Sequence, residues 1–399
     1  MNIVRHAINK KLFGGSGGGA SGGGSSSPDR PLAFWFFTGL DQRIDVEEDE
    51  DWNQTYIYSD PKESVIVPSH AQDGSATSFT DMFASFTDDP YNFTMFKDGL
   101  WVKEICGVIN AASATSLRSL FTSCSYTEKI CDIINTGHVT NFSNMFYHCF
   151  ALTSIPALDT KSATTMAYMF SNCTSLTSVP ELDTRNVTDF SDMFSNCTSL
   201  TSVPELDTRN ATTMAYMFNN CTSLTSVPEL DTRNATTMAN MFSSCTSLTS
   251  VPELDTRNAT TMANMFYACR SLTSIPTLDA RNATTIGNIC NGCAALESVR
   301  VKNIKAAINF AYANNLTVDS LVGLCYELRK PGGNKTLTIG STNLSKLNNV
   351  YVKTIDITAE MKAEYDLVYE KLPFVVCDST DEGACLIRDY VTSKGWKVA

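Results

Sequence analysis

The sequence predicts an α+β protein whose centre is a curved solenoid of tandem 24-residue units, each made of a strand, a turn and a short helix. A cysteine recurs every 24 residues from Cys149 to Cys293. Met and Phe residues keep one register between these cysteines, as in the Met-x-x-Met-Phe of residues 214–218. The pattern weakens at both ends, where terminal units must close the core against water. Units of this length cannot bury their apolar face alone, so they are expected to stack on their neighbours.

A single unit, residues 173–196, divides into two halves. The Thr/Ser-rich stretch from Leu176 to Val179 suits a short strand, which Pro180 ends because proline cannot donate to a sheet ladder. Apolar residues from Val187 to Phe194 fall at i, i+3, i+6 and i+7, which predicts a short helix. Because the helical side is bulkier, the strands are expected on the concave side of the array.

The array is expected to span residues 75–300, with nine helix modules between Phe79 and Cys293. A small β module at 28–74 precedes it, with strands at 30–40 and 54–68 around an acidic loop at 47–51.

An α+β cap is predicted to follow at residues 301–399. Its expected elements are a helix over Val318–Leu328 and strands over Lys335–Ile339 and Val350–Ile357.

Inward-facing columns of the array are predicted to form a structural spine. A column of cysteines can hold metal or form disulfides, but zinc needs two to four ligands converging on one point, whereas these lie one per unit. We therefore interpret them as buried thiols that pack as small hydrophobic side chains. The spine residues are Cys173, Cys197, Cys221, Cys245, Phe194, Phe218 and Phe242.

Polar columns supply the candidate binding face. Serines recur on the expected strand side, and Asp and Arg columns recur in the turns, where they are either ligand contacts or turn-forming residues with solvated salt links. An asparagine column beginning at Asn186 is expected to cap the turns with its side chains. The candidate face comprises Ser178, Ser202, Ser226, Ser250, Arg185, Arg209, Arg233 and Arg257.

The repeat unit resembles the BspA-like leucine-rich repeats, specifically the class with the consensus N-V-T-x-M-x-x-M-F-x-x-C-x-x-L. The resemblance covers residues 113–300 and implies a leucine-rich-repeat solenoid that serves adhesion. One departure is an extra residue near Pro180 and Glu181, which leaves open the geometry that joins strand to turn.

Both ends resemble parts of bacteriophage proteins. Residues 334–347 and 390–399 resemble the closing segments of repeat proteins of gut phages. A short amphipathic segment at 1–13 followed by a Gly/Ser linker at 14–27 resembles the virion-anchoring end of phage fibre and decoration proteins. Such a short helix is unstable alone and needs a partner, while the linker is a flexible tether; a disordered tail is the alternative. The expected virion anchor is Ile3, Val4, Ala7, Ile8 and Phe13.

Composition narrows the function classes. The 399 residues carry 30 Lys and Arg against 42 Asp and Glu, a formal charge of −12, which disfavours nucleic acid and anionic membranes as partners. No run of about 18 apolar residues predicts a membrane span, and residues 1–13 lack the continuous apolar run of a secretion signal.

Catalysis is not expected, and neither is a cofactor or a metal. The neighbouring His148 and Cys149 form the only obvious dyad, but adjacent residues on a helix do not face each other. No nucleotide-binding or hydrolase motif appears.

The leading hypothesis is a non-enzymatic bacteriophage virion protein, exposed on the particle. Its N-terminus is expected to bind other virion proteins and its solenoid a host-surface glycan or protein, with a homotrimer suggested by fibre analogy. The alternatives are a bacterial BspA-like surface adhesin, a purely structural decoration protein and a polysaccharide-degrading spike.

Overall fold

The computed structural model describes residues 44–48, 54–58, 62–66, 102–112, 114–328, 335–354, 374–382 and 384–398. The expected anchor at 1–13, the linker at 14–27 and the strand at 30–40 lie outside the described residues. So do the first helix module, at 75–86, and most of the loop between the predicted strands.

The N-terminal part of the described chain is made of strands. β1 (Ile44–Glu48) and β2 (Gln54–Tyr58) form an antiparallel hairpin. β3 (Lys62–Ile66), β4 (Val102–Asn110) and β5 (Lys129–Ile134) form a parallel sheet in that order. The single strand predicted over 54–68 is thus two strands, and Glu47 and Glu48 end β1 instead of lying in a loop.

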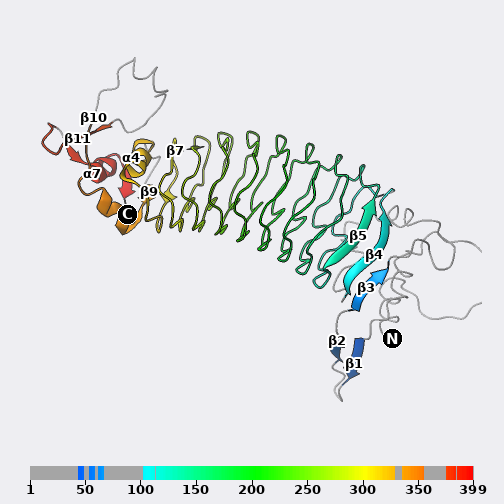
Figure 1. The fold of residues 1–399 in the computed structure, drawn as a ribbon. Helices are drawn as coiled ribbons and strands as arrows, with labels where there is room; N and C mark the ends of the chain where they lie inside the picture. Colours follow the sequence, from blue (N-terminus) through cyan, green and yellow to red (C-terminus); the bar gives the residue numbers. More distant parts are fainter. Residues whose placement is uncertain are drawn as a thin grey trace, which may run out of the picture.

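From β5 onwards the 24-residue units, called rungs here, stack into one curved row (Figure 1). The rungs are joined by a line of isolated parallel bridges, one residue per rung. The bridge residues are Ser116, Asn141, Thr165, Asp189, Thr213, Thr237, Thr261 and Thr285. Asn309 in β8 (Ile308–Asn309) continues this line 24 residues after Thr285, so the stacking extends past residue 300.

The helix predicted in each rung is absent from the described rungs, where a run of turns takes its place. The N–H groups of Phe190 and Phe194 donate to Thr213 and Met217 of the next rung at 3.1 and 2.9 Å. Between them, Met193 N–H donates to Phe190 three residues earlier. Alternate amides therefore bind the neighbouring rung, and none is left for the i−4 carbonyl that an α-helix requires.

Left-handed residues produce this geometry. Asp192 has φ 56° and Asn196 has φ 61°, and the same two positions are left-handed in rung after rung. An L-residue in this region ends a right-handed helix, and Asn and Asp tolerate it best. The apolar spacing was read correctly as one buried face, but the backbone beneath it repeats every four residues and is not helical.

The strand predicted over Leu176–Val179 is also wrong for the central rungs, in which that segment is irregular. Its hydrogen bonds to the next rung are sparse, such as Thr201 N–H to Thr177 O at 3.3 Å. Each central rung has a proline at the position of Pro180, and a proline there has no N–H group to donate to a strand ladder. Where Arg300 replaces it, two short strands pair: β6 (Leu278–Asp279) with β7 (Val301–Lys302).

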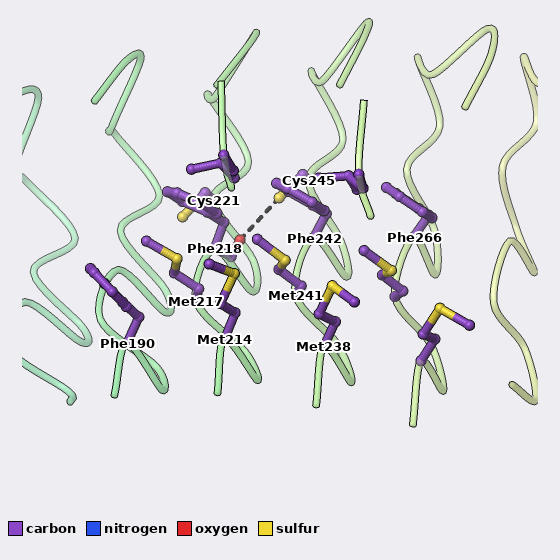
Figure 2. Close-up of a cluster of buried hydrophobic side chains, with 14 of the residues drawn as sticks. Phe190, Met214, Met217, Phe218, Cys221, Met238, Met241, Phe242, Cys245 and Phe266 are labelled. Atoms are coloured by element: carbon purple, nitrogen blue, oxygen red, sulfur yellow. Dashed lines mark hydrogen bonds between the residues drawn. The ribbon is translucent and has the colours of Figure 1, made fainter. Parts of the chain in front are cut away.

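The core is a stack of identical side chains (Figure 2). Neighbouring Phe rings from Phe121 to Phe266 lie nearly parallel, with centroids 5.4–5.6 Å apart. Met and Cys side chains pack around these rings, and all of them are fully buried, as for Met217 and Cys221. Each rung thus supplies one layer of a continuous column, so its stability depends on its two neighbours.

The C-terminal cap mixes helices and strands, as predicted. α4 (Val318–Tyr326) is capped at its N-terminus by Thr317, whose side chain accepts a hydrogen bond from Ser320 N–H. β8, β9 (Lys335–Thr338) and β13 (Trp396–Val398) form a parallel sheet. β10 (Tyr351–Thr354) pairs antiparallel with β11 (Phe374–Cys377) and β12 (Cys385–Leu386). The remaining helices are α5 (Gly340–Lys346) and α7 (Ile387–Ser393).

Candidate binding surface

The Arg and Asp columns form a row of identical ion pairs along the array. Arg209 Nε donates to Asp207 Oδ1 of its own rung at 2.8 Å, and the Arg209 N–H donates to the same oxygen. The Arg209 side chain is 68 % exposed, so the pair is solvated. Hydrogen bonding from Arg209 holds the pKa of Asp207 below its ordinary value. The same arrangement recurs at Asp183–Arg185, Asp231–Arg233 and Asp255–Arg257.

Two further columns fix the spacing of these pairs. Asn210 Nδ2 donates to Arg185 O of the preceding rung at 2.7 Å, and the other asparagines of that column repeat this bond. The buried Thr184 hydroxyl donates to Asp207 O of the following rung at 3.1 Å. The asparagines therefore tie rungs together, where the sequence suggested that they cap turns. The buried threonine column was not singled out from the sequence.

A shallow groove of about 1170 Å³ runs across three rungs beside Arg185, Arg209 and Arg233. A second groove of about 810 Å³ is lined by residues from Glu229 to Arg257. The first groove contains five carboxylates against three arginines, and each arginine is already paired with an aspartate. This surface therefore does not favour an anionic ligand. Its carboxylates are Asp183, Glu205, Asp207, Glu229 and Asp231.

The two parts of the predicted binding face do not form one site. The serine column is exposed as expected, but none of its members lines either groove. The arginines line both grooves. The serine residues are Ser178, Ser202, Ser226 and Ser250.

The structure buries the predicted spine residues completely. Cys221 Sγ donates to Phe194 O at 3.0 Å, and Cys245 Sγ to Phe218 O at 3.0 Å, the bond drawn in Figure 2. Burial raises the pKa of Cys197 and of Cys245 to about 12. A neutral, hydrogen-bonded thiol in this setting is a packing element, because only the thiolate is a nucleophile or a metal ligand.

His148 and Cys149 differ in their surroundings. Cys149 is fully buried, with its Sγ donating to Phe121 O at 3.1 Å. The partly exposed His148 ring stacks on Tyr147 and Phe150, with centroid distances of 3.9 and 5.4 Å. Burial lowers the pKa of His148.

Exposed tyrosines on the turn segments were missed by the sequence reasoning. Tyr168, Tyr216 and Tyr267 are about two-fifths exposed, and Tyr312 is 71 % exposed. Tyr168, Tyr216 and Tyr312 occupy left-handed positions, with φ of 61°, 60° and 66°. A signal was present in the repeats, because the units 197–220, 221–244 and 245–268 are identical at all but three positions, and those positions include Tyr216 and Tyr267.

Comparison with known proteins finds similarity over the array. A family model described as Mycoplasma protein of unknown function, DUF285, matches residues 115–226 and 201–303. No curated protein matches.

Three solved bacterial structures are similar at low identity. A leucine-rich repeat protein from Eubacterium ventriosum is 22 % identical over 48 % of this chain, with a TM-score of 0.30, and the match covers 59 % of its own length. A leucine-rich cell surface protein from Faecalibacterium prausnitzii is 14 % identical, covering 64 % of this chain and 92 % of that one, with a TM-score of 0.21. A leucine-rich repeat protein from Bacteroides ovatus is 15 % identical, covering 77 % and 96 %, with a TM-score of 0.20. None of these three is a phage protein, and the chain is thus similar to bacterial leucine-rich-repeat proteins.

Proposed function

We propose that this protein is a non-enzymatic binding scaffold of the adhesion type. The observation that carries the proposal is the way the rungs are joined. Backbone amides, thiols, buried threonines and asparagine amides all bind the neighbouring rung, which fixes rows of exposed polar side chains at one spacing. Such a pre-organised surface loses little conformational entropy on binding an extended partner.

The uniformity of the rungs also favours binding over catalysis. A catalytic centre needs unlike groups converging on one reacting atom. Here each exposed carboxylate of the Asp column is engaged by the arginine two residues later, and the next rung repeats the pair. A polysaccharide-degrading spike would need one privileged pair of carboxylates. In the part of the chain that the structure describes, no helix is long and apolar enough to cross a membrane.

For its location, we propose display from a bacteriophage particle through residues 1–13, with residues 14–27 as the tether. Support comes from the amphipathic pattern and the Gly/Ser run in the sequence. Many copies on one particle would add avidity to individually weak contacts. Display on a bacterial cell, as a BspA-like surface adhesin, is the alternative, and it needs the same rigid array.

Binding of the full chain to intact cells tests the proposal. Fluorescently labelled protein, incubated with a panel of gut bacteria, should bind at least one strain saturably in flow cytometry. A protein that binds none of them, or that releases reducing sugar from their capsules, is not a non-enzymatic adhesin. Immunogold labelling of phage particles and of producing cells decides between the two locations, and a variant lacking residues 1–27 should be lost from the particles.

A further inference from the structure

One face of the array carries the differences between its three most similar rungs, residues 197–268. We call it the variable face and define it by two columns on the turn segments. The first column consists of Tyr168, Asp192, Tyr216, Asn240, Asn264, Asn288 and Tyr312. The second consists of Tyr147, Ser171, Ser195, Asn219, Ser243 and Tyr267, and its three serines are buried.

Sequence differences concentrate on this face although other exposed positions were free to change. The units 197–220, 221–244 and 245–268 are identical in the exposed Ser, Glu, Arg and Thr columns as well as in the core. They differ at the first column, the second column and the residue after it, such as Asn220. Random drift among near-copies would scatter over all solvated positions, because surface substitutions cost little stability. The differences therefore indicate that this face is where rungs acquire distinct contacts.

Tyrosine in the first column is unfavourable for folding. Tyr216 has φ 60°, and its counterparts Asn240 and Asn264 have φ 58° and 56°. A bulky residue in the left-handed region is strained, whereas asparagine is tolerated there. The Tyr216 ring is 41 % exposed, so it gains little from the core in return. Strained residues of this kind point to function.

The side chains of the variable face have the chemistry that recognises sugars. Tyr147 and Tyr168 rings from adjacent rungs meet edge to face, with centroids 6.2 Å apart. Burial and the charge of Asp192 on the next rung raise the pKa of Tyr168, so a carboxylate lies beside this ring. Amide groups lie alongside, with Asn220 Nδ2 donating to Asn196 Oδ1 at 2.9 Å. Aromatic faces stack on the C–H faces of pyranose rings, and carboxylate and amide groups bind vicinal hydroxyls.

Spacing and charge favour one ligand class. Tyr168 and Tyr216 are two rungs apart, roughly 10 Å for strands about 4.8 Å apart, which is of the order of one disaccharide repeat in an extended glycan. Asp192 is the one charged residue among the two columns, so the face does not favour a polyanion. We propose that the variable face binds a neutral polysaccharide chain running along the array, with Tyr168, Tyr216 and Tyr267 as stacking platforms. This inference rests on the binding function proposed above.

The test replaces each tyrosine by the residue that a sister rung uses at the same position. The triple variant Tyr168→Asn, Tyr216→Asn, Tyr267→Ser keeps the fold, because Asn240 and Ser243 already occupy those columns. Full chain and variant are run in native gels containing cello-oligosaccharides, laminarin, yeast mannan or galactan. We expect at least one gel to retard the full chain, and the triple variant to bind about tenfold or more weakly. A matched control, Thr212→Ala with Thr236→Ala, changes exposed side chains outside the grooves and the two columns and should bind as the full chain does.

The outcomes separate this inference from the proposed function. Equal retardation of the triple variant, or no retardation in any neutral gel, overturns the saccharide assignment. Cell binding that survives periodate oxidation of the cells and persists in the triple variant also overturns it, while leaving an adhesin with a protein ligand. Retardation in the gels without binding to any cell supports the saccharide site and refutes the adhesin.

Discussion

Removing one ring from the aromatic column should destabilise the array strongly, and Phe218→Ala is the most direct case. Phe218 is fully buried, and its ring centroid lies 5.6 Å from those of both Phe194 and Phe242. Truncating a buried Phe to Ala costs about 3–5 kcal/mol, and each lost aromatic pair adds about 0.5–1.5 kcal/mol, part of which is already counted. We expect a loss of about 4–6 kcal/mol in the free energy of unfolding.

Urea unfolding followed by far-ultraviolet circular dichroism measures this loss. With an m-value of about 3 kcal/mol/M, the midpoint should fall by about 1.3–2 M. Tyr216→Ala is the matched control, because it removes an aromatic ring from the same rung at an exposed position. Its midpoint should move by less than about 0.3 M. Equal midpoints for the two variants would mean that the rings do not stabilise the stack.

Three further predictions follow from the same contacts. Alkaline pH should destabilise the protein. Burial raises the pKa of Cys245 from 9.0 to about 12. Between those two pH values the thiol ionises only in the unfolded chain, so the free energy of unfolding falls as pH rises. In urea titrations at several pH values, Cys245→Ala should reduce the slope of the free energy of unfolding against pH by about 1.4 kcal/mol per pH unit. An unchanged slope would mean that the thiol is not buried. Thr208→Val should lower the free energy of unfolding by about 1 kcal/mol, because the buried hydroxyl donates to Asp231 O at 3.1 Å. The control Thr212→Val, at an exposed position, should lower it by less than about 0.5 kcal/mol in the same titration. A larger loss for the control would show that the buried hydrogen bond does not stabilise the rung. Tyr216→Asn should stabilise the protein by about 1 kcal/mol in thermal unfolding, and a lower melting temperature would show that the ring is not strained.

The burial pattern of the rungs was predictable, and the backbone that produces it was not. Periodicity identified which residues face inward, since the Phe194 and Cys197 positions keep their register in the units from Phe146 to Cys269. Their spacing of i and i+3 also suits a helix. A helix was therefore predicted where the structure has a run of turns. Asp192 and Asn196 gave the missing signal, because Asn and Asp at four-residue intervals are typical of left-handed positions.

The cap was predicted more closely because its signals are local. Thr317 precedes a continuous helical pattern, and the helix indeed begins after it. The bonds that join rungs could not be read from one unit, since each pairs residues more than twenty positions apart, as Asn210 does with Arg185. The arginine row was recognised, but its pairing with aspartates of the same rung leaves it a less specific recognition element than the tyrosines.

Within a rung, most residues that stack on the neighbouring rungs are different from the residues of the variable face. This separation explains how such an array can change its ligand without losing its fold. Most contacts that join rungs use the core, the backbone, or columns identical in the units 197–268, such as the Thr208 and Asn210 columns. The variable face uses positions whose backbone is fixed by amides bound to the next rung, as for Tyr216 N–H and Ala239 O at 2.9 Å. Because that bond does not depend on the side chain, Asn and Tyr can be exchanged there at a cost of about 1 kcal/mol. Recognition can thus be altered one rung at a time, while the stability of the stack stays with the Phe, Met and Cys layers.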